Sequence, residues 1–181
     1  MRAEPIHPSS NQVLTEQQFR QVYDAYFAFV WRCLRGLGVA EPQLDDAAQE
    51  VFVVVHRRLA EFRGDSSVRT WLYSIVRGVA ANHRRSKRRK ESLHAPQMNL
   101  IDSGLGPERS YQQQQQIRFV ESFVDTLSEE RRDVFVLAMI DQMPVPEVAE
   151  TLGIPLNTAY TRLRAVRLEF QKALKRLRDP L

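Results

Sequence analysis

The chain has 181 residues, enough for one ordinary domain or two small ones, and 43% of them are hydrophobic. That share supports compact cores and excludes a wholly disordered chain. The single cysteine, Cys33, excludes an intramolecular disulfide and a cysteine-rich zinc site, and it indicates a reduced setting. The N-terminal region lacks a secretion signal, and no apolar run approaches the ~20 residues of a spanning helix, so we expect a soluble, cytoplasmic protein.

The net charge of +4 is unevenly distributed along the chain. The segment from Arg63 to Lys90 contains nine basic residues and one acidic residue. The segment from Leu156 to Arg178 contains seven basic residues and one acidic residue. The segment between them, Ile117 to Glu150, holds eight acidic and three basic residues. One basic run alone is more often a solvated helix face. Two basic runs, each on a predicted helix with an apolar stripe, indicate two binding sites for a polyanion.

The first elements are helices. Residues 1–14 predict a flexible tail, and Thr15 is placed to cap a helix that runs to Gly36. Pro42 is placed to open a second helix at its first turn. Its run of residues 51–55 (VFVVV) locally favours a strand, but a helical stripe continues through it, so we predict helix. The stripe consists of Leu44, Ala47, Ala48, Val51 and Val55.

A third helix follows a turn at residues 64–67, where Ser66 or Ser67 is placed to cap it. The pattern predicts a buried stripe and a neighbouring basic one, and the helix ends near Lys90 in NHRRSKRRK. Trp71 lies on the border between the two stripes. The buried stripe is Val68, Leu72, Ile75, Val76 and Val79, and the neighbouring one is Arg69, Tyr73, Arg77 and Arg84.

The helical pattern fails between residues 93 and 115, which we interpret as a flexible linker whose glutamine run already favours helix. Beyond it, Ser128 is placed to cap a helix that extends through Ile140. The chain is therefore predicted to be all-α, with two small helical domains at 15–92 and 116–181 joined by that linker.

Residues 146–163 have the pattern of a helix-turn-helix. Gly153 supplies a left-handed turn between two helices that cross closely at Ala149. The outward face of the second helix, which in this motif enters the DNA major groove, carries Asn157, Thr161 and Arg164, with Tyr160 beside them. A plain αα-hairpin is the alternative.

Four stretches together resemble the extracytoplasmic function (ECF) group of bacterial RNA polymerase sigma factors. In chain order they are DDAAQEVF (45–52), FRGDSSVRTWLYSIVRG (62–78), LSEERRDVFVL (127–137) and VPEVAETLGIPLNTAYTRLRAVR (145–167). The resemblance implies a two-domain initiation factor that is not an enzyme and needs no cofactor or metal. Its first domain is expected to dock on the β′ coiled coil of core RNA polymerase and to melt the −10 element of promoter DNA. Its second is expected to sit on the β flap and read the −35 element. An anti-sigma factor is a further implied partner.

The resemblance also assigns residues. Asp46, Gln49 and Glu50 are expected to bind core polymerase, although a merely solvated helix surface fits the same residue types. The −10 strand is expected to meet Arg63, Gly64, Asp65, Ser66, Ser67, Arg69, Trp71, Tyr73, Arg77, Arg84 and Arg85. The −35 element is expected to meet Asn157, Thr158, Tyr160, Thr161, Arg162 and Arg164.

The sequence departs from the family pattern at Gly78, where asparagine is frequent, and at Tyr160, where lysine or arginine is common. Two other function classes stay open. A stand-alone repressor or activator would use the helix-turn-helix alone and would bind its operator without polymerase. An enzyme is disfavoured, because the four histidines lack metal-ligand spacing and no glycine-rich phosphate loop exists.

Overall fold

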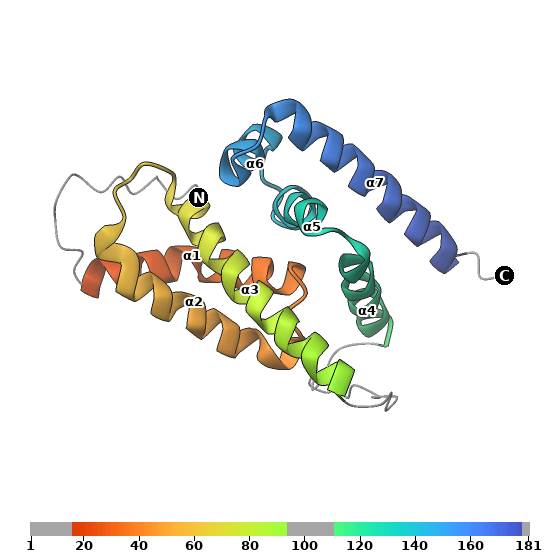
Figure 1. Cartoon of the computed structure of the whole chain (residues 1–181), viewed down its shortest axis with the longest axis horizontal. Coiled ribbons are helices and arrows are strands. Elements are labelled where there is room, and N and C mark those ends of the chain that lie inside the picture. Colours follow the sequence, from red (N-terminus) through yellow and green to blue (C-terminus); the bar gives the residue numbers. More distant parts are fainter. Residues whose placement is uncertain (1–15, 94–110, 179–181) are drawn as a thin grey trace. The chain divides into compact units, whose positions relative to one another are not determined.

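The computed structural model describes residues 16–93 and 111–178, which contain helices and turns and no strand. They form two compact units, whose helices are seen in Figure 1. The first unit contains α1 (Glu16–Gly36), η1 (Glu41–Gln43), α2 (Leu44–Arg58), η2 (Leu59–Glu61) and α3 (Val68–Leu93). The second contains α4 (Tyr111–Thr126), α5 (Glu129–Phe135), η3 (Val136–Ile140), α6 (Val145–Leu152) and α7 (Leu156–Arg178). The prediction of an all-α protein is confirmed.

The predicted domain bounds can be compared with the structure only at the two edges of the linker. Thr15, the tail at 1–14 and most of the linker lie outside the described residues. Leu93 still belongs to α3, and the glutamines at 112–116 already belong to α4. The helical preference of glutamine accounts for this early start of α4.

The core of the first unit is built from one apolar face of each of its three long helices. Leu34 of α1, Val51 and Val55 of α2, and Leu72 and Val76 of α3 are fully buried. In the valine-rich run of α2, Val51 and Val55 face this core while Val53 is 43% exposed. Burial four residues apart, rather than two, is the helical period, so the prediction of helix over strand is confirmed.

Local side-chain chemistry sets where α2 and α3 begin. Pro42 lies in the 3₁₀ turn η1 that leads into α2, rather than in the first turn of α2 itself. Of the two serines predicted to cap α3, Ser67 does so, because its Oγ accepts a hydrogen bond from the Thr70 N–H at 3.1 Å. The predicted buried stripe of α3 is confirmed, with every member at most 8% exposed.

An aromatic cluster and a buried arginine hold the second unit together. Phe119 and Phe123 of α4, Phe135 of α5 and Phe170 of α7 pack with ring centroids 5.0–5.8 Å apart. Arg132 is only 2% exposed. Its Nε donates to the Val124 carbonyl at 3.0 Å and its Nη2 to the Leu127 carbonyl at 2.8 Å. The Val124 carbonyl also accepts from the Leu127 N–H at 3.2 Å, so Arg132 adds a side-chain bond to the turn that follows α4 and ties α5 to it.

The helix predicted to run from Ser128 through Ile140 changes its pitch part way. Ser128 precedes it with extended backbone but makes no side-chain cap hydrogen bond. The α-helical part ends at Phe135, and Val136–Ile140 form a π-helical turn, in which the Asp141 N–H donates to the Val136 carbonyl at 2.9 Å. Such turns are rare and have no strong sequence signal.

Candidate nucleic-acid and polymerase interfaces

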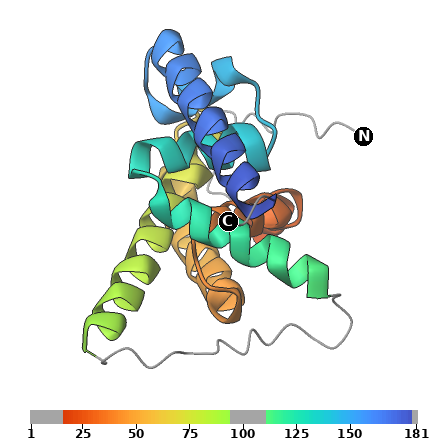
Figure 2. The same cartoon turned by 90° about the vertical axis from the view of Figure 1, so that its right-hand side faces the viewer.

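Helices α6 and α7 form the predicted helix-turn-helix, seen in Figure 2 as the blue part of the chain. Gly153 ends α6 in the left-handed conformation, with φ 63°. The Ile154 N–H donates to the Ala149 carbonyl at 3.0 Å, and the Gly153 N–H donates to the Glu150 carbonyl at 3.1 Å. These two bonds make a Schellman motif, which ends α6 and turns the chain toward α7. The small, buried Ala149 and Ala159 allow the two helices to approach closely.

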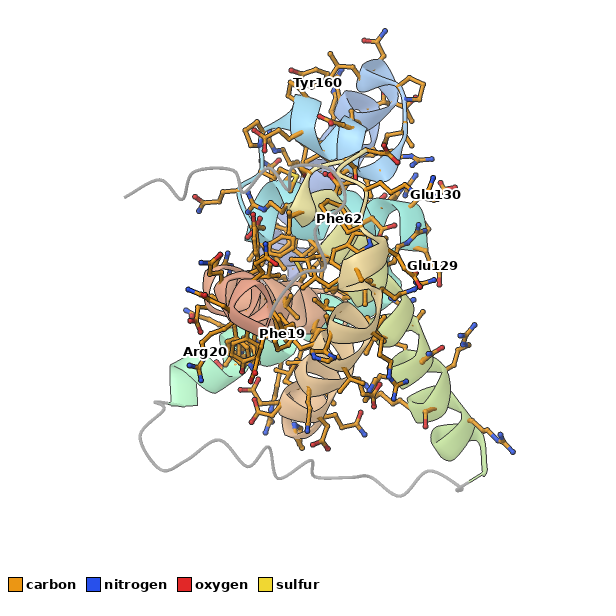
Figure 3. All side chains as sticks on the ribbon, turned by 90° about the vertical axis from the view of Figure 1, so that its left-hand side faces the viewer. Phe19, Arg20, Phe62, Glu129, Glu130 and Tyr160 are labelled. Carbon is orange, nitrogen blue, oxygen red and sulfur yellow. The ribbon has the colours of Figure 1, made fainter. Side chains whose placement is uncertain are left out.

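The outward face of α7 carries most of the residues predicted to meet the −35 element. Asn157, Thr161 and Arg164 are exposed, and Tyr160, labelled in Figure 3, is 52% exposed. Thr158 is half-buried. The Thr161 hydroxyl donates to the Asn157 carbonyl of the preceding turn at 2.8 Å, which fixes the rotamer of that side chain. This face offers a guanidinium, an amide and hydroxyls, the groups that read base edges.

Arg162 differs from the other predicted −35 residues because it has a partner inside the protein. Its Nη2 lies 3.0 Å from the Glu130 carboxylate of α5. A second pair, Arg131 with Glu169 at 2.6 Å, joins the same two helices. Arg162 therefore ties α7 to α5, whereas Arg164, two residues further along, is exposed. Glu130 was not among the sequence-predicted residues, since nothing in the sequence links it to Arg162.

The turn before α3 presents the residues predicted to hold a base of the −10 strand. Arg63, Gly64, Asp65 and Ser67 are exposed and Ser66 is half-buried. Gly64 has φ 76°, a conformation that favours glycine and folds the turn tightly. Trp71 is half-buried against Phe62, with ring centroids 5.0 Å apart, which agrees with its predicted border position.

The basic stripe predicted on α3 needs one correction. Tyr73 is 1% exposed and belongs to the core, so its ring has no face for stacking on a base. Adjacent residues on a helix are ~100° apart, and the buried arc of α3 is wide enough to include both Leu72 and Tyr73. Arg69 is half-buried over the Phe29 ring at 4.8 Å, and Arg77 is exposed.

The exposed face of α3 instead runs through residues three or four apart. Ser74, Gly78, Asn82 and Arg85 are all exposed, whereas Arg84 is half-buried. The Arg85 guanidinium donates to the Asn82 side-chain oxygen. Ser74 and Asn82 were missed by sequence reasoning, although their four-residue spacing from Gly78 was a usable signal. An added Cβ at Gly78 would meet no atom within 4 Å, so this face has a bare stretch of backbone at its centre.

The residues predicted to bind core polymerase share one surface of α2. Asp46, Gln49 and Glu50 are all exposed. The Glu50 carboxylate also lies 3.3 Å from Nε2 of His83 on α3. The polar face of α2 is therefore joined directly to the helix that carries the basic residues. In the described part of the chain, no three potential metal ligands come together, and no helix has the length and apolarity to cross a membrane.

Two family models match the chain in the order of its two units. The model for sigma-70 region 2 matches residues 22–90, and the model for sigma-70 region 4 matches residues 120–177. The chain is 28% identical over 166 residues to the RNA polymerase sigma factor YlaC of Bacillus subtilis, which covers 91% of this chain and 94% of YlaC. It is 26% identical over 172 residues to the ECF sigma factor SigW of the same bacterium, covering 90% and 91%.

Solved structures show the same fold. CnrH in complex with the cytosolic domain of CnrY is similar with a TM-score of 0.68 at 22% identity, over 89% of this chain and 90% of that one. The sigma factor RpoE of Bartonella quintana, in complex with the anti-sigma factor NepR, is similar with a TM-score of 0.64 at 17% identity, over 88% and 98%. With both family models matched in order and relatives similar along nearly their whole length, the chain belongs to the extracytoplasmic function group of sigma-70 RNA polymerase sigma factors.

Proposed function

We propose that this chain binds core RNA polymerase and directs it to promoters, by reading the −35 element with α7 and by capturing and melting the −10 element with the turn before α3 and the exposed face of α3. The observation that carries the proposal is the occurrence, in one chain, of a helix-turn-helix with an exposed Asn157–Arg164 face and a second, separate basic helix. A single DNA-reading module needs only the first of these.

The two promoter elements are proposed to bind chemically different surfaces of the protein. The α7 face carries Arg164 and Asn157, whose donors and acceptors match base edges in the major groove of a duplex. The Gly64 turn offers backbone and small side chains, and Arg77 and Arg85 on α3 offer cations, a combination that suits an unpaired strand with an extruded base. The protein therefore needs no catalytic group or cofactor of its own.

Partners and location follow from the same assignment. Asp46, Gln49 and Glu50 would pair with basic groups of the polymerase β′ coiled coil, because an acidic and amide surface complements arginines. The second unit would sit on the β flap, and the protein would work in the cytoplasm, where polymerase and promoters are. The structure of CnrH is solved in complex with the cytosolic domain of CnrY, and that of RpoE in complex with the anti-sigma factor NepR, which supports an anti-sigma factor as a regulator of this chain as well.

The test compares DNA binding with and without polymerase. We expect the purified chain alone to bind promoter duplex weakly, and the chain with core enzyme to bind it tightly and to open it. Tight, sequence-specific binding by the chain alone, unchanged by core enzyme, would instead indicate a stand-alone repressor or activator.

A further inference from the structure

The first turns of α7 carry two large apolar side chains that lie open to solvent. Leu156 is 44% exposed, and Tyr160, labelled in Figure 3, is 52% exposed. They are four residues apart, about one helical turn, so they lie on the same side of the helix. One exposed leucine is ordinary, but two large apolar side chains together indicate an interaction site. Leu156 was not among the residues that the sequence predicted to meet the −35 element.

This apolar pair adjoins the polar groups proposed to read the −35 element. Asn157 follows Leu156 directly, and Arg164 lies four residues, about one turn, after Tyr160. Arg167, seven residues after Tyr160 and so on the same side of α7, is also exposed. Two cations beside the pair favour a polyanionic partner over an apolar protein surface. The pair is therefore continuous with the surface of α7 proposed to enter the major groove of a duplex.

The major groove contains one chemical group that suits an apolar side chain. Thymine presents its 5-methyl group there, whereas the other bases present hydrogen-bond donors and acceptors. Contact between that methyl group and an aliphatic or aromatic side chain removes apolar surface of both from water. We infer that Leu156 and Tyr160 together read a thymine of the −35 element through its 5-methyl group. This inference rests on the proposed function, and it makes Leu156 a further specificity-determining residue.

The neighbouring polar residues define the sequence around that thymine. An asparagine amide pairs with N6 and N7 of adenine, and a guanidinium pairs with O6 and N7 of guanine. Asn157 and Arg164 are seven residues apart, which is ~10.5 Å along the helix at 1.5 Å per residue. A helix that follows the groove spans ~3 base pairs over that length, at 3.4 Å per base pair. The methyl-read thymine therefore lies at an A·T pair about three base pairs from the G·C pair that Arg164 reads.

The experiment removes the methyl group from the DNA and the apolar side chains from the protein. Core polymerase loaded with this chain is titrated with a promoter duplex in which each −35 thymine, on either strand, is replaced in turn by deoxyuridine. We expect wild type to bind about fourfold more weakly at one or two neighbouring thymines, the loss for one buried methyl group. With Leu156→Ala and Tyr160→Ala combined, the same replacement is expected to change binding by less than about 1.5-fold. The matched control is Leu168→Ala, which removes an equally exposed leucine (49%) from the later part of α7 and keeps the wild-type pattern.

Other outcomes overturn the inference in distinguishable ways. If wild type binds the promoter specifically and no deoxyuridine weakens it, no thymine methyl group is read, and the proposed function stands. If a deoxyuridine weakens wild type and the double variant equally, another part of the protein reads that methyl group. If the double variant binds core polymerase more weakly in the absence of DNA, the pair contacts protein instead. If wild type with core polymerase binds no promoter specifically, the proposed function fails and the inference fails with it.

Discussion

The buried Arg132 is predicted to be the main polar support of the second unit, and Arg132→Leu tests this. The leucine keeps an apolar stem but removes both hydrogen bonds to the carbonyls of Val124 and Leu127. Hydrogen bonds from a charged donor contribute ~1.5–3 kcal/mol each. Part of that is regained because a cation no longer has to be buried. We therefore expect a net loss of ~3 kcal/mol, which lowers the melting temperature of a unit this small by ~12 °C or more.

Two spectroscopic signals separate the units. Both tryptophans, Trp31 and Trp71, lie in the first unit, so tryptophan fluorescence reports its unfolding alone, while circular dichroism at 222 nm reports helices of both. Arg132→Leu is expected to lower the melting step seen only by circular dichroism and to leave the fluorescence transition in place. The control is Arg131→Leu, whose exposed pair with Glu169 contributes only ~0–1 kcal/mol. Equal effects of the two substitutions would refute the reasoning.

Three further substitutions test other parts of the account. Arg164→Ala is expected to weaken binding of the polymerase complex to its −35 element by ~1–3 kcal/mol, because the guanidinium reads a base. Competition with duplexes substituted at each −35 position measures this loss. An equal loss on every duplex would mean that Arg164 contacts a phosphate instead. Gly78→Ala is expected to raise the free energy of unfolding of the first unit by ~1 kcal/mol, since glycine disfavours helix and an added methyl group meets no atom there. Urea unfolding followed by tryptophan fluorescence measures this gain. No gain would mean that Gly78 is strained or packed. Ser67→Ala is expected to cost that unit ~1 kcal/mol through loss of the α3 cap, with Ser66→Ala as a neutral control.

Local chemistry explains what the sequence predicted well. The cap at Ser67 and the left-handed turn at Gly153 depend on a few neighbouring residues, and both are found in the structure. The helical choice for the valine-rich part of α2 was also correct, because burial at Val51 and Val55 outweighs local strand preference.

What the sequence did not predict depends on tertiary packing. Periodicity places the centre of a buried face but not its width, so Tyr73 was assigned to the outside of α3 although it lies in the core. Tyr23 of α1 is 39% exposed and lines an open groove with Phe19 and Phe27, because a helical apolar pattern does not say whether a neighbouring element covers it. The pairing of Arg162 with Glu130 brings together residues 32 apart in sequence, which no local pattern encodes.

The central claim, that this chain gives core polymerase its promoter specificity, is tested most directly by run-off transcription from genomic fragments with the start sites sequenced. Core enzyme with this protein is predicted to start at a defined set of sites that share upstream −35 and −10 sequences, whereas core enzyme alone does not start there. The same start sites with and without the protein, or no transcript from any fragment, would contradict the claim.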